Sequence, residues 1–134
     1  MVSTVFLAAL IAGAPAGDVK VDVGKGNFSA FPALTVKRDL PSATLVAAVE
    51  RILTSGACRM PGQTSRRFDI TVPYAVEVTP DGSTRHVIVA DQGCPALEKF
   101  VGEIVLKLGA MGDFAPYKSG TAKWYSSEIN FTQQ

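Results

Sequence analysis

Residues 68–101, FDITVPYAVEVTPDGSTRHVIVADQGCPALEKFV, hold the pattern that decides the fold. Apolar and polar side chains alternate over residues 68–78, which is typical of a strand with one buried and one solvated face. Asp81-Gly82 marks a tight hairpin turn, and residues 85–91 follow it as a second strand. From Pro95 the apolar period becomes that of a helix. The stretch therefore predicts strand, turn, strand and helix.

Two prolines refine this prediction. Pro73 removes a hydrogen-bond donor from the first strand, which favours an edge position or a bulge there. Pro95 fits the first turn of a helix that extends to about Leu108, because its missing N–H has no partner in that turn. The apolar face of this helix has i, i+3, i+4 spacing and comprises Leu97, Phe100, Val101, Ile104, Val105 and Leu108.

The flanking sequence completes the order of elements. Residues 41–55 show a helical apolar face, with Pro41 in the first turn and Gly56 as the stop. A polar loop with Arg59, Arg66 and Arg67 follows. Residues 122–131 predict a last strand with Tyr125, Ile129 and Phe131 on one side. The order helix, strand, strand, helix, strand predicts an α+β fold with two helices on one face of a small antiparallel sheet.

Length and charge limit the classes of function. The chain has 134 residues, 13 basic and 12 acidic side chains, one histidine and a formal net charge of +1. A nucleic-acid surface requires a clustered basic face, so no nucleic-acid partner is expected. The sequence contains no phosphate-binding loop, dinucleotide fingerprint or zinc-protease motif, and we predict no cofactor and no metal site.

The N-terminal segment predicts export. Residues 5–14 are apolar but shorter than the roughly 20 residues of a membrane-spanning helix, so no stable membrane span is expected. Ala14-Pro15-Ala16 resembles a signal-peptide cleavage site, which makes residues 1–16 a signal peptide. The absence of Lys and Arg from MVST leaves a buried N-terminal strand as the alternative. Residues 17–40 are an arm or linker that includes the alternating stretch VKVDV, and residues 41–134 form the domain.

Cys58 and Cys94 are the only cysteines. In an oxidising compartment such a pair is most often a disulfide, and two buried free thiols are the alternative. A thiol enzyme would need Cys58 as nucleophile and His86 as base, but the cysteine's flanks match no catalytic signature. Asp91 lies an odd number of residues from His86 along the strand and so faces the other side. We therefore expect no enzyme, and a packing role for His86.

Several elements of residues 67–131 together resemble the C-terminal domain family of TonB. The strand, the Asp-Gly hairpin, the helix with a Leu-acid pair, an aromatic-x-Pro element, a glycine and a final apolar-x-Phe strand occur in the family's order. Phe31-Pro32 is similar to the aromatic-Pro pair that often starts such domains. The matching positions are Asp81-Gly82, Gly93, Leu97-Glu98, Phe114-Ala115-Pro116, Gly120 and Ile129-Asn130-Phe131.

The resemblance implies a periplasmic domain of a Gram-negative cell that docks on outer-membrane TonB-dependent receptors. In that family the last strand pairs with an extended receptor segment, since an exposed strand edge offers unpaired N–H and C=O groups. Carried over to this chain, the docking strand comprises Trp124, Tyr125, Ser126, Ser127, Glu128, Ile129, Asn130 and Phe131. The membrane anchor and Pro-rich spacer of a full transducer are not in this sequence, and a cysteine pair is not a general family feature.

The expected function is therefore protein binding by edge-strand addition, as an accessory to transport at the outer membrane. The alternative is a structural or assembly role as a periplasmic homodimer. The aromatic residues of GDFAPYKSGTAKWY could stack a ligand between lysines, but a hydrophobic plug with surface lysines is the simpler interpretation.

Overall fold

The computed structural model describes residues 19–114 and 120–134. Residues 1–16, the expected signal peptide, and Ala115-Pro116 of the aromatic-x-Pro element lie outside the described residues. In the described part, no helix combines the length and the apolar character that a membrane crossing requires. The elements in chain order are β1 (Lys20–Gly24), α2 (Ala43–Thr54), β2 (Phe68–Val78), β3 (Thr84–Ala90), α3 (Pro95–Ala110) and β4 (Lys123–Gln133).

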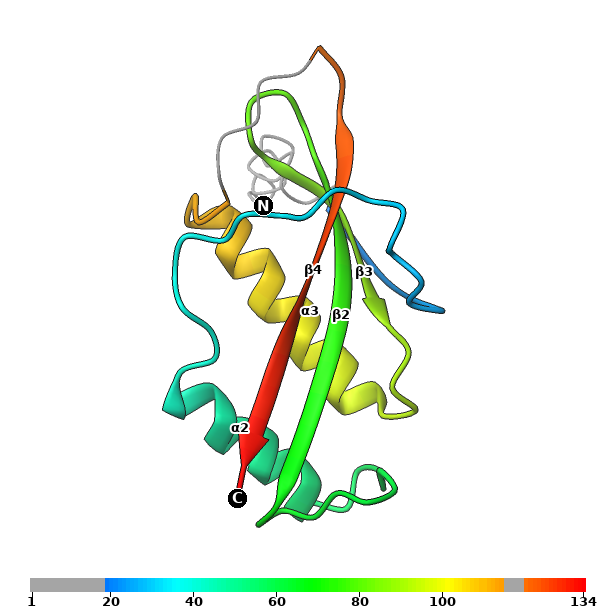
Figure 1. Cartoon of the computed structure of the whole chain (residues 1–134), viewed down its shortest axis with the longest axis vertical. Coiled ribbons are helices and arrows are strands. Elements are labelled where there is room, and N and C mark those ends of the chain that lie inside the picture. The colour runs from blue at the N-terminus through cyan, green and yellow to red at the C-terminus, as the bar shows by residue number, and fades with distance from the viewer. Residues whose placement is uncertain (1–18, 115–119) are drawn as a thin grey trace, which may run out of the picture.

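The four strands form one open sheet in the order β1-β3-β2-β4 (Figure 1). β2 runs antiparallel to both β3 and β4, with Tyr74 opposite Val89 and Val72 opposite Ile129. β1 pairs with β3 in parallel, with Val21 opposite Val87. The α+β class and the helix-strand-strand-helix-strand order are confirmed. The sheet is mixed rather than antiparallel, because the stretch VKVDV joins it as a parallel strand.

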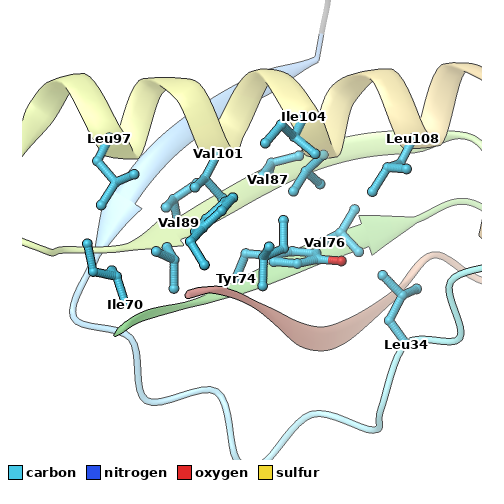
Figure 2. Packing of buried hydrophobic residues seen from close by; sticks show 14 of the residues in the cluster. Leu34, Ile70, Tyr74, Val76, Val87, Val89, Leu97, Val101, Ile104 and Leu108 are labelled. Carbon is cyan, nitrogen blue, oxygen red and sulfur yellow. The ribbon is translucent and has the colours of Figure 1, made fainter. Parts of the chain in front are cut away.

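One face of the sheet packs against α3, and Figure 2 shows the interdigitated side chains between the two layers. Leu97, Val101 and Leu108 of α3 are buried among Tyr74, Val76, Val87 and Val89 of the sheet. Val49 of α2 is fully buried in the same cluster. Burying each side chain of this size contributes about 1.5–3 kcal/mol relative to leaving it exposed. The alternating strand pattern and the helical period therefore meet in one core.

Both helices begin with residues that are typical of helix N-termini, but the first residues of α2 differ from the prediction. Ser42 is the N-cap of α2, and its Oγ accepts a hydrogen bond from the backbone N–H of Leu45 at 3.3 Å. Pro41 therefore precedes the cap and does not lie in the first turn. Pro95 occupies the first turn of α3 as predicted.

The expectation of an edge position or a bulge at Pro73 is wrong, because β2 lies inside the sheet and its irregularity falls between Glu77 and Val78. Ser126 of β4 points its backbone groups away from β2, so its partner Ala75 points toward β3. Pro73, two residues earlier, also faces β3, where pairing begins only at Tyr74. The missing N–H of Pro73 therefore costs no ladder hydrogen bond.

The hairpin between β2 and β3 is held by its own side chains. The hydroxyl of Thr79 donates to the carboxylate of Asp81, and the backbone N–H of Ser83 donates to the same carboxylate at 3.1 Å. The hydrogen bonds from Thr79 and then from Ser83 hold the pKa of Asp81 below its ordinary value. The Asp-Gly turn thus carries its own anchoring network.

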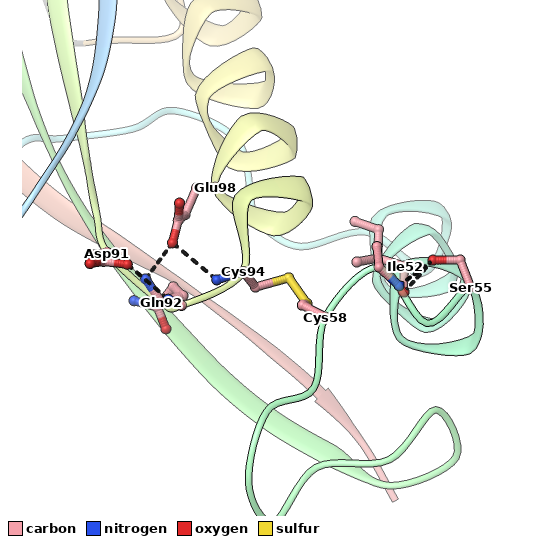
Figure 3. Close-up of a disulfide and its surroundings, with 9 residues drawn as sticks. Ile52, Ser55, Cys58, Asp91, Gln92, Cys94 and Glu98 are labelled. Atoms are coloured by element: carbon pink, nitrogen blue, oxygen red, sulfur yellow. Dashed lines mark hydrogen bonds between the residues drawn. A yellow bond between two sulfur atoms is a disulfide. The ribbon is translucent and has the colours of Figure 1, made fainter.

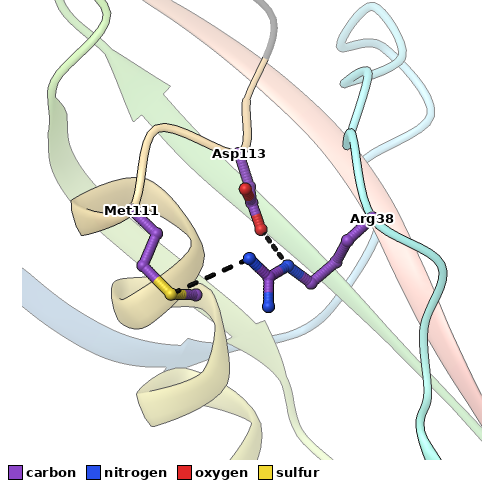
Figure 4. Close-up of polar contacts among 3 residues, drawn as sticks. All are labelled: Arg38, Met111 and Asp113. Carbon is purple, nitrogen blue, oxygen red and sulfur yellow. Dashed lines mark hydrogen bonds and ion pairs between the residues drawn. The ribbon is translucent and has the colours of Figure 1, made fainter.

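Residues 25–42 link β1 to α2 across the face of the sheet opposite α3 (Figure 1). From here on, "the arm" means this segment and not the expected range 17–40. The arm leaves this face beyond β4 and is fixed to the end of α3. There the Arg38 guanidinium pairs with the carboxylate of Asp113 and contacts the sulfur of Met111 at 3.9 Å (Figure 4). The backbone N–H of Lys37 donates to the carbonyl of Asp113 at 2.7 Å. The arm therefore wraps around the β4 side of the sheet.

Candidate functional site

β4 is a terminal strand of the sheet and pairs with β2 along its whole length, from Lys123 opposite Val78 to Gln133 opposite Phe68. In an antiparallel pair, successive residues point their backbone groups alternately toward and away from the partner. Ser126 points away from β2, so the even-numbered residues of β4 face outward. These outward N–H and C=O groups form the outer edge of β4, where the sequence placed a docking strand.

The arm occupies one position of this edge. The backbone N–H of Leu34 donates to the carbonyl of Ser126 at 2.8 Å, and the N–H of Ser126 donates to the carbonyl of Pro32 at 2.9 Å. Ala33 thereby forms a parallel bridge to Ser126. Within residues 19–114 and 120–134, no strand pairs with the outer edge beyond this point. The length without a strand partner, which we call the open length, is therefore Ser127–Gln133, shorter at its start than the expected docking strand. Of the helices, α2 contacts β4 as well.

The side chains of this open length alternate between two environments. Ile129 and Phe131 are buried on the helix face, and the ring centroids of Phe131 and Phe100 are 6.2 Å apart. Glu128 and Asn130 are exposed on the opposite face, while Ser127 is half-buried. The amide Nδ2 of Asn130 donates to Asp69 and Thr71, both at 2.7 Å. Core packing and these cross-strand bonds hold β4 against β2.

Trp124 and Tyr125, the first residues of the expected docking strand, have other roles. Tyr125 is buried at 7% exposure. Trp124 stacks on Phe31 of the arm with ring centroids 5.7 Å apart, and its ring is 5.1 Å from that of His86. Tyr125 is therefore part of the core, and Trp124 packs against the arm. Both residues lie at the start of β4, next to the position that the arm covers.

His86 has a carboxylate partner that sequence reasoning missed. Its Nε2 lies 2.6 Å from Oδ2 of Asp22 in β1. Asp81 and Asp91 were the carboxylates near it in sequence, and neither is the partner. The alternation of VKVDV indicates a strand, but only the parallel pairing with β3 places Asp22 beside His86. The histidine contributes to cross-strand packing, as the sequence suggested.

Cys58 and Cys94 form a disulfide with their Cα atoms 5.3 Å apart, joining the loop after α2 to the start of α3 (Figure 3). A thiol enzyme would need the free thiol of Cys58 as its nucleophile. The disulfide removes that thiol in this oxidised form. The carboxylate of Glu98 accepts hydrogen bonds from the N–H of Gln92 at 2.6 Å and of Cys94 at 3.3 Å. Among the described residues, no cluster of His, Cys, Asp and Glu could hold a metal ion.

Comparison with known proteins identifies no relative: no family model matches the chain, and neither a curated protein nor a solved structure does. The geometry of the outer edge of β4 is therefore the main basis for a functional proposal.

Proposed function

We propose that the chain is a periplasmic protein-binding module that takes an extended segment of an outer-membrane receptor along the outer edge of β4. The receptor segment adds to the sheet as a further strand, through backbone hydrogen bonds to the outward-facing residues Glu128, Asn130 and Thr132. The module then acts as an accessory to transport at the outer membrane. The TonB-like order of motifs supports the class of partner.

The observation that carries the proposal is the open length of β4. Backbone groups on a terminal strand are a template for pairing, and proteins usually protect them. Here the arm protects only Ser126 among the described parts of the chain. β4 itself pairs with β2 at eleven positions, from Phe68 to Val78, so β4 is already ordered before a partner binds.

The disulfide supports the proposed periplasmic location. Disulfides persist in oxidising surroundings such as the bacterial periplasm and are rare where thiols are kept reduced. Cys94 is fully buried, and Cys58, in the loop that follows α2, is half-buried. The pair therefore fits a structural disulfide of an exported protein.

The same edge also fits a second copy of the chain, which is the second candidate. An antiparallel pairing with Asn130 opposite its own counterpart would set Glu128 opposite Thr132 of the other copy. This register avoids opposing like charges, which destabilise a strand pair. The alternative function is then a structural homodimer, with the docking edge buried between the copies.

Replacing Asn130 with proline tests strand addition, because the N–H of Asn130 points away from β2 and is not needed for the β2 ladder. We expect N-terminal peptides of TonB-dependent receptors to shift the amide resonances of Glu128, Asn130 and Thr132 in ¹⁵N spectra. Asn130→Pro should weaken binding about tenfold, since an outward hydrogen bond is lost and its neighbours are disturbed. The measurement is a titration followed by NMR.

Asn130→Thr is the matched control, because it removes the same amide side chain but keeps the backbone N–H. Its affinity should stay within about twofold of the parent, the range of a near-neutral surface change. Equal binding by the proline and threonine variants would reject strand addition at this edge. Failure of every receptor peptide to bind would reject the assigned class of partner.

A further inference from the structure

The segment from the end of α2 to the start of β2 is the most cationic part of the chain. Residues 51–68 contain Arg51, Arg59, Arg66 and Arg67 and no acidic residue. The whole chain has a net charge of +1, so the remainder carries 1 − 4 = −3. Arg51 lies in the last turn of α2, where a cation stabilises the helix dipole. The other three arginines have no such local role.

Those three arginines lie on residues 56–67, which we call the arginine loop. All three side chains are exposed, and none forms an ion pair with another residue of the described chain. A single exposed arginine is ordinary on a protein surface. Three cations concentrated on twelve residues form a local positive field that is strongest for a partner in contact. The nearest acid in sequence, Asp69, has its carboxylate hydrogen-bonded to Asn130 and Thr132.

The arginine loop is firmly held, although it has no regular secondary structure. The disulfide fixes it at Cys58, and the N–H of Gln63 donates to the carbonyl of Met60 at 3.0 Å. The N–H of Thr64 donates to the carbonyl of Arg67 at 2.9 Å, and the N–H of Asp69 donates to Oε1 of Gln63 at 2.8 Å. A fixed loop presents its charges at constant spacing and loses little entropy on binding.

Two hollows lie along the loop and meet at Gln63, which lines both. The first has a volume of about 470 Å³ and is lined by Leu53, Met60 and Pro61, with Arg59 at its wall. The second, of about 380 Å³, lies beside Arg67 and reaches Thr132 and Gln133 at the end of β4. Asp69 also lines it, and its carboxylate accepts hydrogen bonds from Asn130 and Thr132.

We propose that the arginine loop is a second docking surface, which binds an acidic extended segment of a partner protein. Carboxylates of the segment pair with Arg59, Arg66 and Arg67, and one apolar side chain enters the hollow between Leu53 and Met60. Guanidinium groups suit this role because they bind carboxylates through two parallel hydrogen bonds. The site stands on its own charges and hollows, independently of strand addition at β4.

An acidic peptide fits these features better than an anionic membrane. A membrane-binding surface combines several cations with apolar side chains that protrude into the lipid. In the arginine loop Met60 is half-buried and lines a hollow, as does Leu53 of α2. A hollow with Arg59 at its wall can receive a side chain of a partner, whereas binding to a bilayer requires side chains that protrude from the protein.

The probe is a fluorescent peptide with one leucine flanked on each side by glutamates, measured by anisotropy against the folded, oxidised protein. We expect Arg59→Gln, Arg66→Gln and Arg67→Gln together to weaken its binding about tenfold or more at low salt. The matched control replaces the exposed lysines Lys25, Lys37 and Lys99 with glutamine, which removes the same charge. Its affinity should stay within about twofold.

Further probes separate this site from the alternatives. The same peptide with glutamines for glutamates should bind far more weakly, and a glycine for its leucine should also reduce affinity. Glu128→Pro, which removes an outward N–H of β4 at a residue that lines neither hollow, should leave acidic-peptide binding within about twofold, which distinguishes this surface from strand addition. Equal loss in the arginine and lysine triple variants would overturn the proposal. Arginine-dependent binding to phosphatidylglycerol vesicles without peptide binding would make the surface a membrane contact instead.

Discussion

Glu98 shows how one buried carboxylate organises the start of a helix. Its side chain is only 5% exposed and accepts hydrogen bonds from the N–H groups of Gln92 and Cys94, which precede α3. Backbone donors at a helix N-terminus favour a negative charge, because the helix dipole places partial positive charge there. The acid of the Leu97-Glu98 pair therefore has a structural function in this chain, next to the disulfide.

Replacing Glu98 with glutamine tests that function. The N–H groups of Gln92 and Cys94 donate to the same oxygen, Oε2, so an amide oxygen can still accept both, but the negative charge that strengthens these hydrogen bonds is lost. We expect the free energy of unfolding to fall by about 1–3 kcal/mol, the cost of weakened hydrogen bonds to a buried charged group. Urea denaturation at neutral pH measures this change.

Glu103→Gln, on the exposed side of α3, is the matched control and should change stability by less than about 0.5 kcal/mol. Equal stability of the two variants would show that the Glu98 carboxylate contributes nothing beyond its volume.

At the scale of the elements, the disulfide connects two segments that no hydrogen-bond ladder joins. It fixes the loop after α2 to the N-cap residue of α3, across a sequence separation of 36. Cross-linking a loop of this length removes conformational freedom from the unfolded chain. It also holds the arginine loop near one end, so the same bond stabilises the fold and fixes the position of the loop.

We expect the double variant Cys58→Ser and Cys94→Ser to lose about 3–4 kcal/mol of unfolding free energy in the chain-entropy account. Thermal or urea unfolding with and without reductant measures the loss. Reductant should destabilise the parent by a similar amount and leave the double variant unchanged. A parent protein that is indifferent to reductant would show that the bond does not contribute to stability.

The elements themselves were largely predictable because their signals are local. The alternation of residues 68–78, the Asp81-Gly82 turn and the apolar period after Pro95 each act over a few residues. The error at Pro73 arose because a proline's effect depends on which neighbour its nitrogen faces, and on where that neighbour's pairing begins. The register between the strands determines which neighbour the nitrogen faces and where pairing begins. The sequence of a single strand does not reveal that register.

At the scale of the whole molecule, the least predictable features were the parallel pairing of β1 and the path of the arm. Asp22 meets His86, and Pro32 meets Ser126, over sequence distances that no local pattern spans. The path of the arm matters for the proposed strand addition, since the arm pairs with the outer edge of β4 at Ser126 and with no residue beyond it. The site's strand was predictable, and its usable length was not.

The number of copies is also a property of the whole molecule. We expect sedimentation to give the mass of a monomer, because the proposed partner needs an unoccupied edge. Asn130→Pro should then leave the mass unchanged. A dimer that Asn130→Pro dissociates would replace receptor binding with self-pairing as the function of this edge.

The position of β1 has a mechanical consequence. β1 and β4 are opposite edges of the sheet, so tension between the start of β1 and a partner held on β4 would load the three strand ladders in series. The β1–β3 and β2–β3 ladders each join five residue pairs and the β2–β4 ladder eleven. Because Val21 and Val23 of β1 are exposed, whereas Val87 and Val89 of β3 are fully buried, we expect β1 to yield first. The bonds from Pro32 and Leu34 to Ser126 would then stop the release. We therefore expect β1 to lengthen under load while the pairing of β4 with β2 stays intact.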